Sequence, residues 1–295
     1  MRIPIQSEIA PPLWRRVALA GLLAAFLPAL APAAQSAYTQ EPADSLVRAV
    51  IENEARDDDS RVPYLYRLRR QWPERSETRD IVSTRDGLVA SLVAVNDEPP
   101  DAGLRARDDA RIEALLANSE EQLKRKRQQE KDAERVRKMI RTLPDAFLYE
   151  HDGVEDSPHG PLLRLKFRPR PEFDPPTRET LVFKGMEGFI LLHERDRRLV
   201  KIDAMLVKDV KLGWGILAHL DKGGRFMVEK TRLPSGRWEI FRMTLNFRGK
   251  ALLFKTIRIE QQQAIINFQP VPSDLTLAQG VALLRKQNGV VAEKK

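Results

Sequence analysis

The chain has 295 residues and no cysteine, which excludes disulfide bonds and the lipidated cysteine of a bacterial lipoprotein. Its apolar fraction of 42% and charged fraction of 31% fit a folded core with a highly charged surface element, and they exclude disorder throughout. The formal net charge is +8.

The N-terminus has the pattern of a secretory signal peptide over residues 1–33. Arg2, Arg15 and Arg16 precede an uncharged apolar run at residues 17–31, and A-x-A-like cleavage sites follow. A membrane anchor is the alternative, but the run is shorter than the roughly 20 residues that span a bilayer. We therefore expect the peptide to be cleaved and the mature protein to be periplasmic or secreted.

The first part of the mature chain predicts a helix and three strands. Apolar residues share one helical stripe within residues 41–57, which predicts a short amphipathic helix capped by Asp44 or Ser45. Three strand-like runs follow, and Asp86-Gly87 between the last two is a strong hairpin signal. The runs are residues 64–69, 79–84 and 88–95.

A charge-dense insertion at about residues 101–142 then interrupts the strands. From Arg105 to Arg141 it contains no glycine or proline, and its composition favours helix. Apolar residues gather at the two ends of the insertion, whereas in its middle only Leu123 is strongly apolar. We therefore expect a solvated arm or a pair of helices that stands off the sheet.

The strand pattern returns between Phe147 and Phe268, and Ser273-Asp274 precedes a closing helix at residues 275–284. Short turns between consecutive strands imply an antiparallel sheet, and so many twisted strands should curl. The predicted fold class is therefore mainly β (α+β). We expect one domain at residues 41–295, built as a strongly curved antiparallel sheet or unclosed half-barrel covered by helices. The runs are residues 163–168, 189–193, 199–207, 225–229, 238–247, 252–260 and 264–268.

Residues 147–268 also include a local succession of strands and turns. Residues 187–192 and 198–203 give a strand, a charged turn and a strand that reads L-V-K-I, and Trp238-Glu239-Ile240 precedes Phe241-Arg242-Met243. This succession resembles the LolA-like proteins, the periplasmic lipoprotein-sorting carriers. The resemblance implies an N-terminal helix and an unclosed barrel whose hydrophobic hollow holds acyl chains, with helices on its concave face. The helical insertion is longer and more charged than the resemblance implies.

One strand predicts a face for such a ligand. Phe241, Met243, Leu245 and Phe247 alternate with polar residues, so we expect them on the concave, apolar face. Two further residues, Phe189 and Leu191, are expected on or near the same face. Terminal helices would gate it.

A glycine-flanked tryptophan suggests a second group of ligand contacts. Trp214 lies between Gly213 and Gly215, where the strand alternation breaks. We expect a mobile lip over the hollow, with Trp214, Ile216 and Leu217 touching the ligand. The alternative is a connection whose tryptophan folds back into the core.

A basic run in the insertion is a candidate contact surface. Lys124, Arg125, Lys126 and Arg127 resemble a nucleic-acid patch, but export argues against a nucleic-acid partner. The same charges would gain roughly 1 kcal/mol for each basic residue near an anionic lipid surface. The alternative is a solvated helix whose basic residues pair with neighbouring acids, although residues 118–141 hold nine basic residues against five acidic ones.

Motifs for catalysis and metal binding are absent from the sequence. His151, His159, His193 and His219 lack the spacing of zinc sites, and His193 is expected at the surface. A nucleophile elbow, a phosphate-binding loop and a dinucleotide fingerprint are also missing. We therefore expect no enzyme activity and no cofactor, with a hydrolase of dispersed site residues as an alternative.

These observations predict a non-enzymatic carrier or binding protein for lipoproteins or another acyl-bearing envelope lipid. An anionic membrane surface and an envelope protein are further candidate partners. The alternative function is an envelope interaction or regulatory protein that docks through its charged helical insertion. In that case the sheet would merely be packed, with no hollow for a ligand.

Overall fold

The computed structural model describes residues 41–59, 62–212, 218–251 and 255–293. The predicted signal peptide at residues 1–33 therefore lies outside the described residues. Within the described part of the chain, no helix is both long enough and apolar enough to span a membrane.

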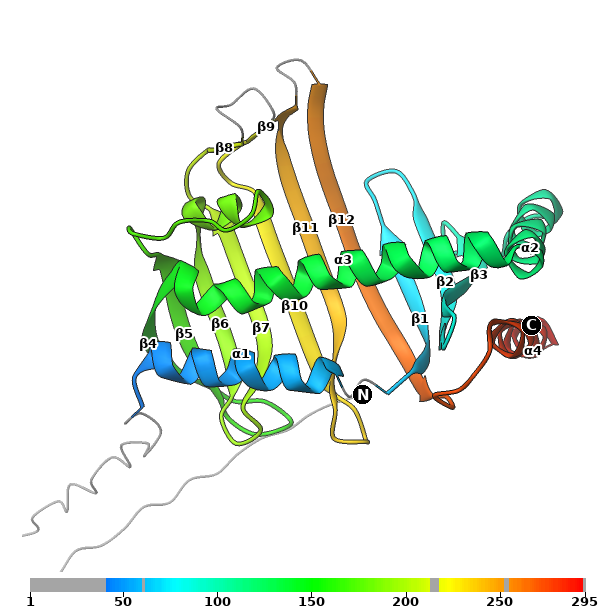
Figure 1. Cartoon of the computed structure of the whole chain (residues 1–295), viewed down its shortest axis with the longest axis horizontal. Helices are drawn as coiled ribbons and strands as arrows, with labels where there is room; N and C mark the ends of the chain where they lie inside the picture. Colours follow the sequence, from blue (N-terminus) through cyan, green and yellow to red (C-terminus); the bar gives the residue numbers. More distant parts are fainter. Residues whose placement is uncertain (1–40, 60–61, 213–217, 252–254, 294–295) are drawn as a thin grey trace, which may run out of the picture. The chain divides into compact units, whose positions relative to one another are not determined.

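The described strands form one antiparallel sheet of 12 strands (Figure 1). They are β1 (Tyr64–Gln71), β2 (Ser76–Thr84), β3 (Gly87–Val95), β4 (Phe147–Glu155), β5 (Leu162–Pro169), β6 (Met186–His193), β7 (Arg198–Leu206), β8 (Val210–Leu212), β9 (Ala218–Leu220), β10 (Arg225–Arg232), β11 (Trp238–Ala251) and β12 (Lys255–Pro270). The main order is β3-β2-β1-β12-β11-β10-β7-β6-β5-β4, and the short pair β8–β9 attaches beside β11. β3 and β4 end this order without pairing to each other, so the sheet is open. The predicted fold class is confirmed.

Four α-helices and one 3₁₀ helix accompany the described strands. They are α1 (Ala43–Asp59), α2 (Ala102–Ala117), α3 (Ser119–Ala146), η1 (Glu179–Gly185) and α4 (Leu277–Glu293). The helices predicted at both ends of the domain are confirmed, and α4 runs further than expected. The insertion forms a pair of helices. They meet at Asn118, whose side-chain oxygen accepts a hydrogen bond from the Glu121 N–H at 3.0 Å and so caps α3.

α3 extends past the predicted end of the insertion. It passes through Pro144 and ends at Ala146, directly before β4. A proline in the last turn has no backbone N–H, so the helix loses one hydrogen bond there. Thr142 and Ala146 are buried on either side of it, so tertiary packing holds this turn in helical form.

β12 joins the first three strands to the rest of the sheet. Residues 255–260 of one predicted run and the whole of the next, residues 264–268, lie in one strand of 16 residues, and residues 252–254 lie outside the described residues. One edge of β12 pairs with β11 and the other with β1, where Leu68 lies opposite Ile265. The N-terminal strands therefore extend the sheet beyond its C-terminal strand.

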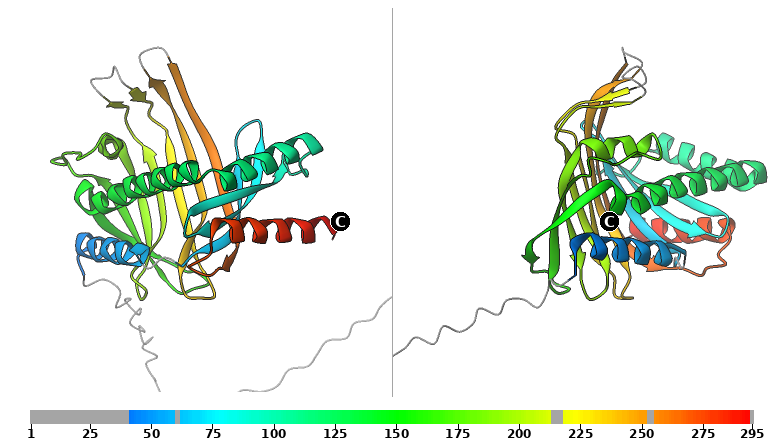
Figure 2. Two further views of the ribbon diagram at one scale, coloured as in Figure 1. Left: turned by 45° about the vertical axis from the view of Figure 1, so that its right-hand side comes forward. Right: turned by 60° about the vertical axis from the view of Figure 1, so that its left-hand side comes forward.

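α3 links the two free edges of the sheet. The chain leaves the sheet after β3 and returns to it at β4. A helix of 28 residues is about 42 Å long, and nine strand spacings of about 4.8 Å make about 43 Å. Figures 1 and 2 show α3 crossing the strands on the same side of the sheet as α1.

Gly188 of β6 packs against the backbone of β7. A Cβ at this position would overlap the carbonyl oxygen of Asp203, which the strand pairing holds in place. We expect Gly188→Ala to lower the free energy of unfolding by about 3 kcal/mol in a urea titration. Gly289 of α4 is the control, because a Cβ there meets no heavy atom within 4 Å. Gly289→Ala should raise stability by about 0.5–1 kcal/mol, and equal midpoints for the two variants would contradict this packing.

Candidate functional site

Two separate hydrophobic cores flank the central strands of the sheet. The first packs α1, the end of α3 and η1 against β4–β7. The second packs α2 and α4 against β1–β3. β10, β11 and β12 lie between these groups in strand order, and no described side chain of theirs belongs to the buried members of either core. The centre of the sheet is therefore less covered than its two ends.

The strand register places an apolar surface on these central strands. Side chains paired across neighbouring strands point to the same face, and the paired β7 residues face the first core. Phe247 continues this face and pairs with Ile259, which is 42% exposed. The apolar side chains that β10 and β11 contribute to this face are half-buried. The two rows are Ala204–Phe226–Leu245 and Ile202–Val228–Met243.

α3 crosses above this apolar surface and leaves one of its own apolar side chains uncovered. Met139, Ile140 and Leu143 pack on the first core. Val136 lies one turn earlier on the same stripe as Ile140 and Leu143, yet it is 55% exposed. Towards the other end of the helix, the Gln129 side chain accepts a hydrogen bond from the Leu88 N–H at 2.9 Å. α3 is therefore held at Gln129 and at residues 139–143, and Val136 between these contacts is exposed.

The opposite face of the same strands is covered by ion pairs. Arg225 bonds Asp203 at 2.8 Å, and Arg242 bonds Glu229 at 3.2 Å. Glu260 accepts hydrogen bonds from two arginines, and the bond from Arg258 is the main cause that lowers the pKa of this carboxyl. One face of the central sheet is thus suited to water and the other to an apolar ligand.

Three of the predicted ligand contacts lie together on the apolar face. Met243, Leu245 and Phe247 follow the alternation predicted for β11. Phe241 does not, because the register between β10 and β11 shifts between Glu229 and Lys230. Its ring lies 5.2 Å from the guanidinium carbon of Arg242. The bulge therefore removes Phe241 from the regular alternation of this strand.

Phe189 and Leu191 point to the ion-paired face, so their predicted placement on the apolar face is wrong. Phe189 pairs with Asp203, and Leu191 pairs with Lys201. The guanidinium carbon of Arg164 lies 3.6 Å from the centre of the Phe189 ring. The side chains of β6 that reach the core are those of the alternate positions, Met186, Ile190 and Leu192. A continuous apolar run carries no alternation that would separate the two sets.

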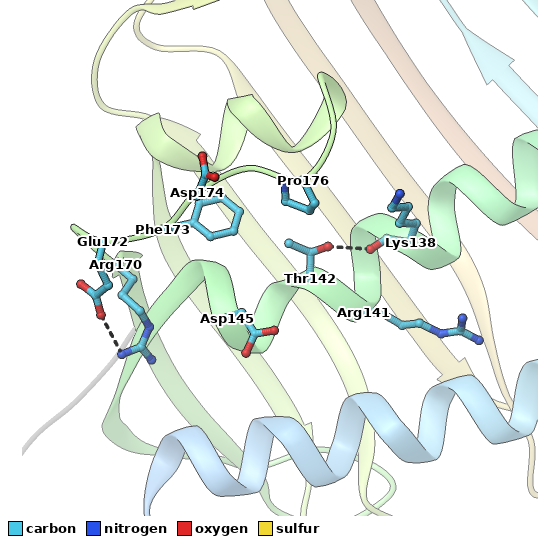
Figure 3. Close-up of a pocket in the computed structure, with 9 residues that line it drawn as sticks. All are labelled: Lys138, Arg141, Thr142, Asp145, Arg170, Glu172, Phe173, Asp174 and Pro176. Carbon is cyan, nitrogen blue, oxygen red and sulfur yellow. Dashed lines mark hydrogen bonds and ion pairs between the residues drawn. The ribbon is translucent and has the colours of Figure 1, made fainter.

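Three hollows of the described structure lie beside the predicted contacts rather than among them. One of about 410 Å³ lies at the end of α3 (Figure 3), one of about 580 Å³ lies beside His193, and one of about 540 Å³ lies between Trp72 and Ile259. The predicted contacts Trp214, Ile216 and Leu217 lie outside the described residues. On the apolar face the side chains of β10 and β11 are half-buried, and Ile259 of β12 is 42% exposed, with Gln261 and Gln263 beside it.

The predicted basic run does not form one continuous patch. Lys126 donates to the carbonyl oxygen of Arg85 at 3.0 Å and so ties α3 to the turn between β2 and β3. Lys124 and Arg125 each lie 4.0 Å from Glu121. Four consecutive residues spread around a helix, so their side chains point in different directions.

His193 is buried, which corrects its predicted position at the surface. The residue is 5% exposed, and its ring lies 5.3 Å from that of Trp238. Its Nε2 bonds the carbonyl oxygen of His159 at 3.0 Å, and the Asp196 N–H donates to its Nδ1 at 3.2 Å. Turns from distant parts of the chain meet at this point, and local sequence carries no sign of that contact.

The polar groups near His193 do not form a nucleophile and base. Ser157 donates its hydroxyl to the carbonyl oxygen of Gly160, and both ring nitrogens of His193 already have partners. Burial alone would raise the pKa of Asp196, but the hydrogen bond from Trp238 and nearby positive charge lower it. In the described ranges, no group of three His, Asp or Glu residues is arranged to hold a metal ion.

Sequence comparisons match no protein family and no curated protein. Comparison with solved structures finds a DUF1329 family protein from Desulfovibrio piger. It is 12% identical to this chain with a TM-score of 0.28, and the match covers 78% of this chain and 94% of that one. This similarity is too weak to assign the chain to a family.

Proposed function

We propose that the protein is a non-enzymatic carrier or binding protein of the periplasm or cell exterior. It holds the acyl chains of a lipoprotein or another envelope lipid against the apolar face of β10, β11 and β12, beneath α3. The observation that carries this proposal is the contrast between the two faces of the central sheet. One face bears ion pairs, whereas the other bears half-buried apolar side chains, of which Val228, Met243 and Leu245 belong to neither hydrophobic core.

Burial of an acyl chain on this face would supply the binding free energy. Each buried methylene contributes roughly 0.8 kcal/mol, so ten of them contribute roughly 8 kcal/mol before the cost of ordering the chain. Met243 and Leu245 would contact the chain from the sheet, and Val136 would contact it from α3. These side chains are half-buried or exposed in the free protein, so a ligand can cover them without displacing a packed core.

The sequence predicts that the terminal helices cover the apolar face, and we assign this role to α3 instead. α1 packs on β4, β7 and α3, and α4 packs on β2, β3 and α2. Both terminal helices thus contact the flanks of the sheet. α3 is held by Gln129 and by the Met139–Leu143 stripe, and a chain would enter beneath the stretch between them, the free middle of α3.

Mass spectrometry of lipids extracted from the purified protein tests this proposal. The protein is purified from a periplasmic fraction without detergent, together with a second periplasmic protein of similar size as the control. We expect an acyl-bearing species at close to one per chain in this protein alone. An empty protein that also fails to bind added fatty-acid probes would refute the proposal.

A further inference from the structure

The side of α3 that faces away from the sheet carries a row of basic side chains. Its members recur at helical spacing and are all exposed. Lys138 is two residues from both Val136 and Ile140, so it lies about 200° around the helix from the stripe that faces the strands. In Figure 3 the strands pass behind α3, whose Lys138 and Arg141 are among the residues that line the hollow. The members of this outer basic row are Lys124, Arg127, Lys131, Lys138 and Arg141.

The stretch of α3 that carries the outer basic row has a net positive charge. Residues 124–141 contain nine Lys and Arg against three acids, a net charge of +6. Two of those acids are already paired within the helix, Asp132 with Arg135 at 3.1 Å and Glu134 with Arg137 at 2.8 Å. In the described structure, every member of the row except Lys124 lacks a carboxylate partner, and Lys124 lies 4.0 Å from Glu121.

The row has the geometry of a surface contact rather than of a pocket. It extends over about 26 Å of helix, so its charges lie along a line and do not converge on one point. Leu123 lies on the same side, one turn before Arg127, and it is 48% exposed. A matching partner offers negative charge along an extended surface together with some apolar contact. The interface of an anionic phospholipid bilayer has both properties.

We propose that the outer basic row docks the protein on a bilayer surface that contains anionic phospholipid. The cations lie against the phosphate head groups, and Leu123 contacts the apolar edge of the interface. This docking goes beyond ligand binding on the apolar face, because it uses the opposite side of α3 and does not require a bound ligand.

Vesicle co-sedimentation of the purified protein tests the docking. Vesicles of phosphatidylcholine alone are compared with vesicles that also contain phosphatidylglycerol. We expect partition onto the anionic vesicles to be at least about tenfold stronger, and to fall to the phosphatidylcholine level at about 0.5 M salt. Binding that is equal on both vesicles, or that salt does not weaken, overturns the proposal without any variant.

Two variants that each lose five charges then locate the contact. The row variant combines Lys124→Gln, Arg127→Gln, Lys131→Gln, Lys138→Gln and Arg141→Gln, and glutamine preserves helix propensity. The control combines Lys184→Gln, Lys208→Gln, Lys222→Gln, Lys250→Gln and Lys255→Gln, which are exposed elsewhere. We expect only the row variant to lose the preference for anionic vesicles. An equal loss in both variants would mean that net charge alone drives binding, and retention by the row variant would exclude this face.

Discussion

Leu245→Glu is expected to weaken the binding of a dansyl-labelled fatty acid at least tenfold, a loss of about 1.4 kcal/mol in binding free energy. Leu245 lies in the same row as Ala204 and Phe226, on the face proposed to hold the acyl chain. A carboxylate at this position would have to lose its water when the ligand covers it. Its neighbour on β12 is Gln261, which offers no positive charge in compensation. Fluorescence titration gives the dissociation constant directly.

Asn246 provides the matched control for this substitution. It is the next residue of the same strand, is exposed, and points to the ion-paired face. Asn246→Glu therefore adds the same charge close to the same place, and it should leave the affinity unchanged. A similar loss of affinity in both variants would show that the ligand does not lie on the face that holds Leu245.

Val136→Glu separates a loss of ligand contact from a loss of stability. Val136 is 55% exposed, so the substitution should leave the urea midpoint unchanged. It should still lower the affinity for the fatty acid, because Val136 faces the strands from the free middle of α3. If only Leu245→Glu lowered the affinity, and its midpoint fell as well, altered packing of the sheet would be the better explanation.

Sequence alone assigns a strand to a face only where polar and apolar residues alternate. In β5, Leu163, Leu165 and Phe167 are buried, as their alternation with basic residues predicts. In β6 the apolar residues are consecutive, so Phe189 and Leu191 have no periodic signal that separates them from their buried neighbours. The register with β5 and β7 decides their side, and register depends on turns and pairings outside the strand.

The path of α3 depends on contacts between distant parts of the chain. Composition predicts a helical insertion with apolar ends, and the structure has both features. In the structure, Ile112 and Leu115 belong to one core, whereas Met139 and Ile140 pack on the other. The local sequence pattern does not predict this division. The separation of the two cores follows from the pairing of β12 with β1. Deleting residues 105–141 would therefore disturb both cores, and charge substitutions on α3 test its contacts more cleanly.

Asp80→Asn is expected to lower the free energy of unfolding by about 3 kcal/mol, a large share of the 5–15 kcal/mol typical of a folded domain. Asp80 is fully buried and accepts two hydrogen bonds from Arg67, at 2.7 and 2.9 Å. The hydrogen bond to Asp80 is the main cause that raises the pKa of Arg67, so this arginine stays charged. Loss of the carboxylate leaves a guanidinium largely out of water with no partner charge. Urea unfolding followed by circular dichroism measures the loss.

A second arginine of β1 supplies a control that differs mainly in burial. Arg69 makes the same two-bond contact to Asp97, at 2.8 and 2.7 Å, but the Asp97 side chain is 62% exposed. Asp97→Asn should therefore leave the unfolding midpoint almost unchanged, because water solvates whatever charge the pair leaves behind. Equal losses for Asp80→Asn and Asp97→Asn would show that burial does not set the cost. Arg67→Met combined with Asp80→Leu removes both charges at once and should recover most of the stability, because apolar groups of similar volume need no partner in that position.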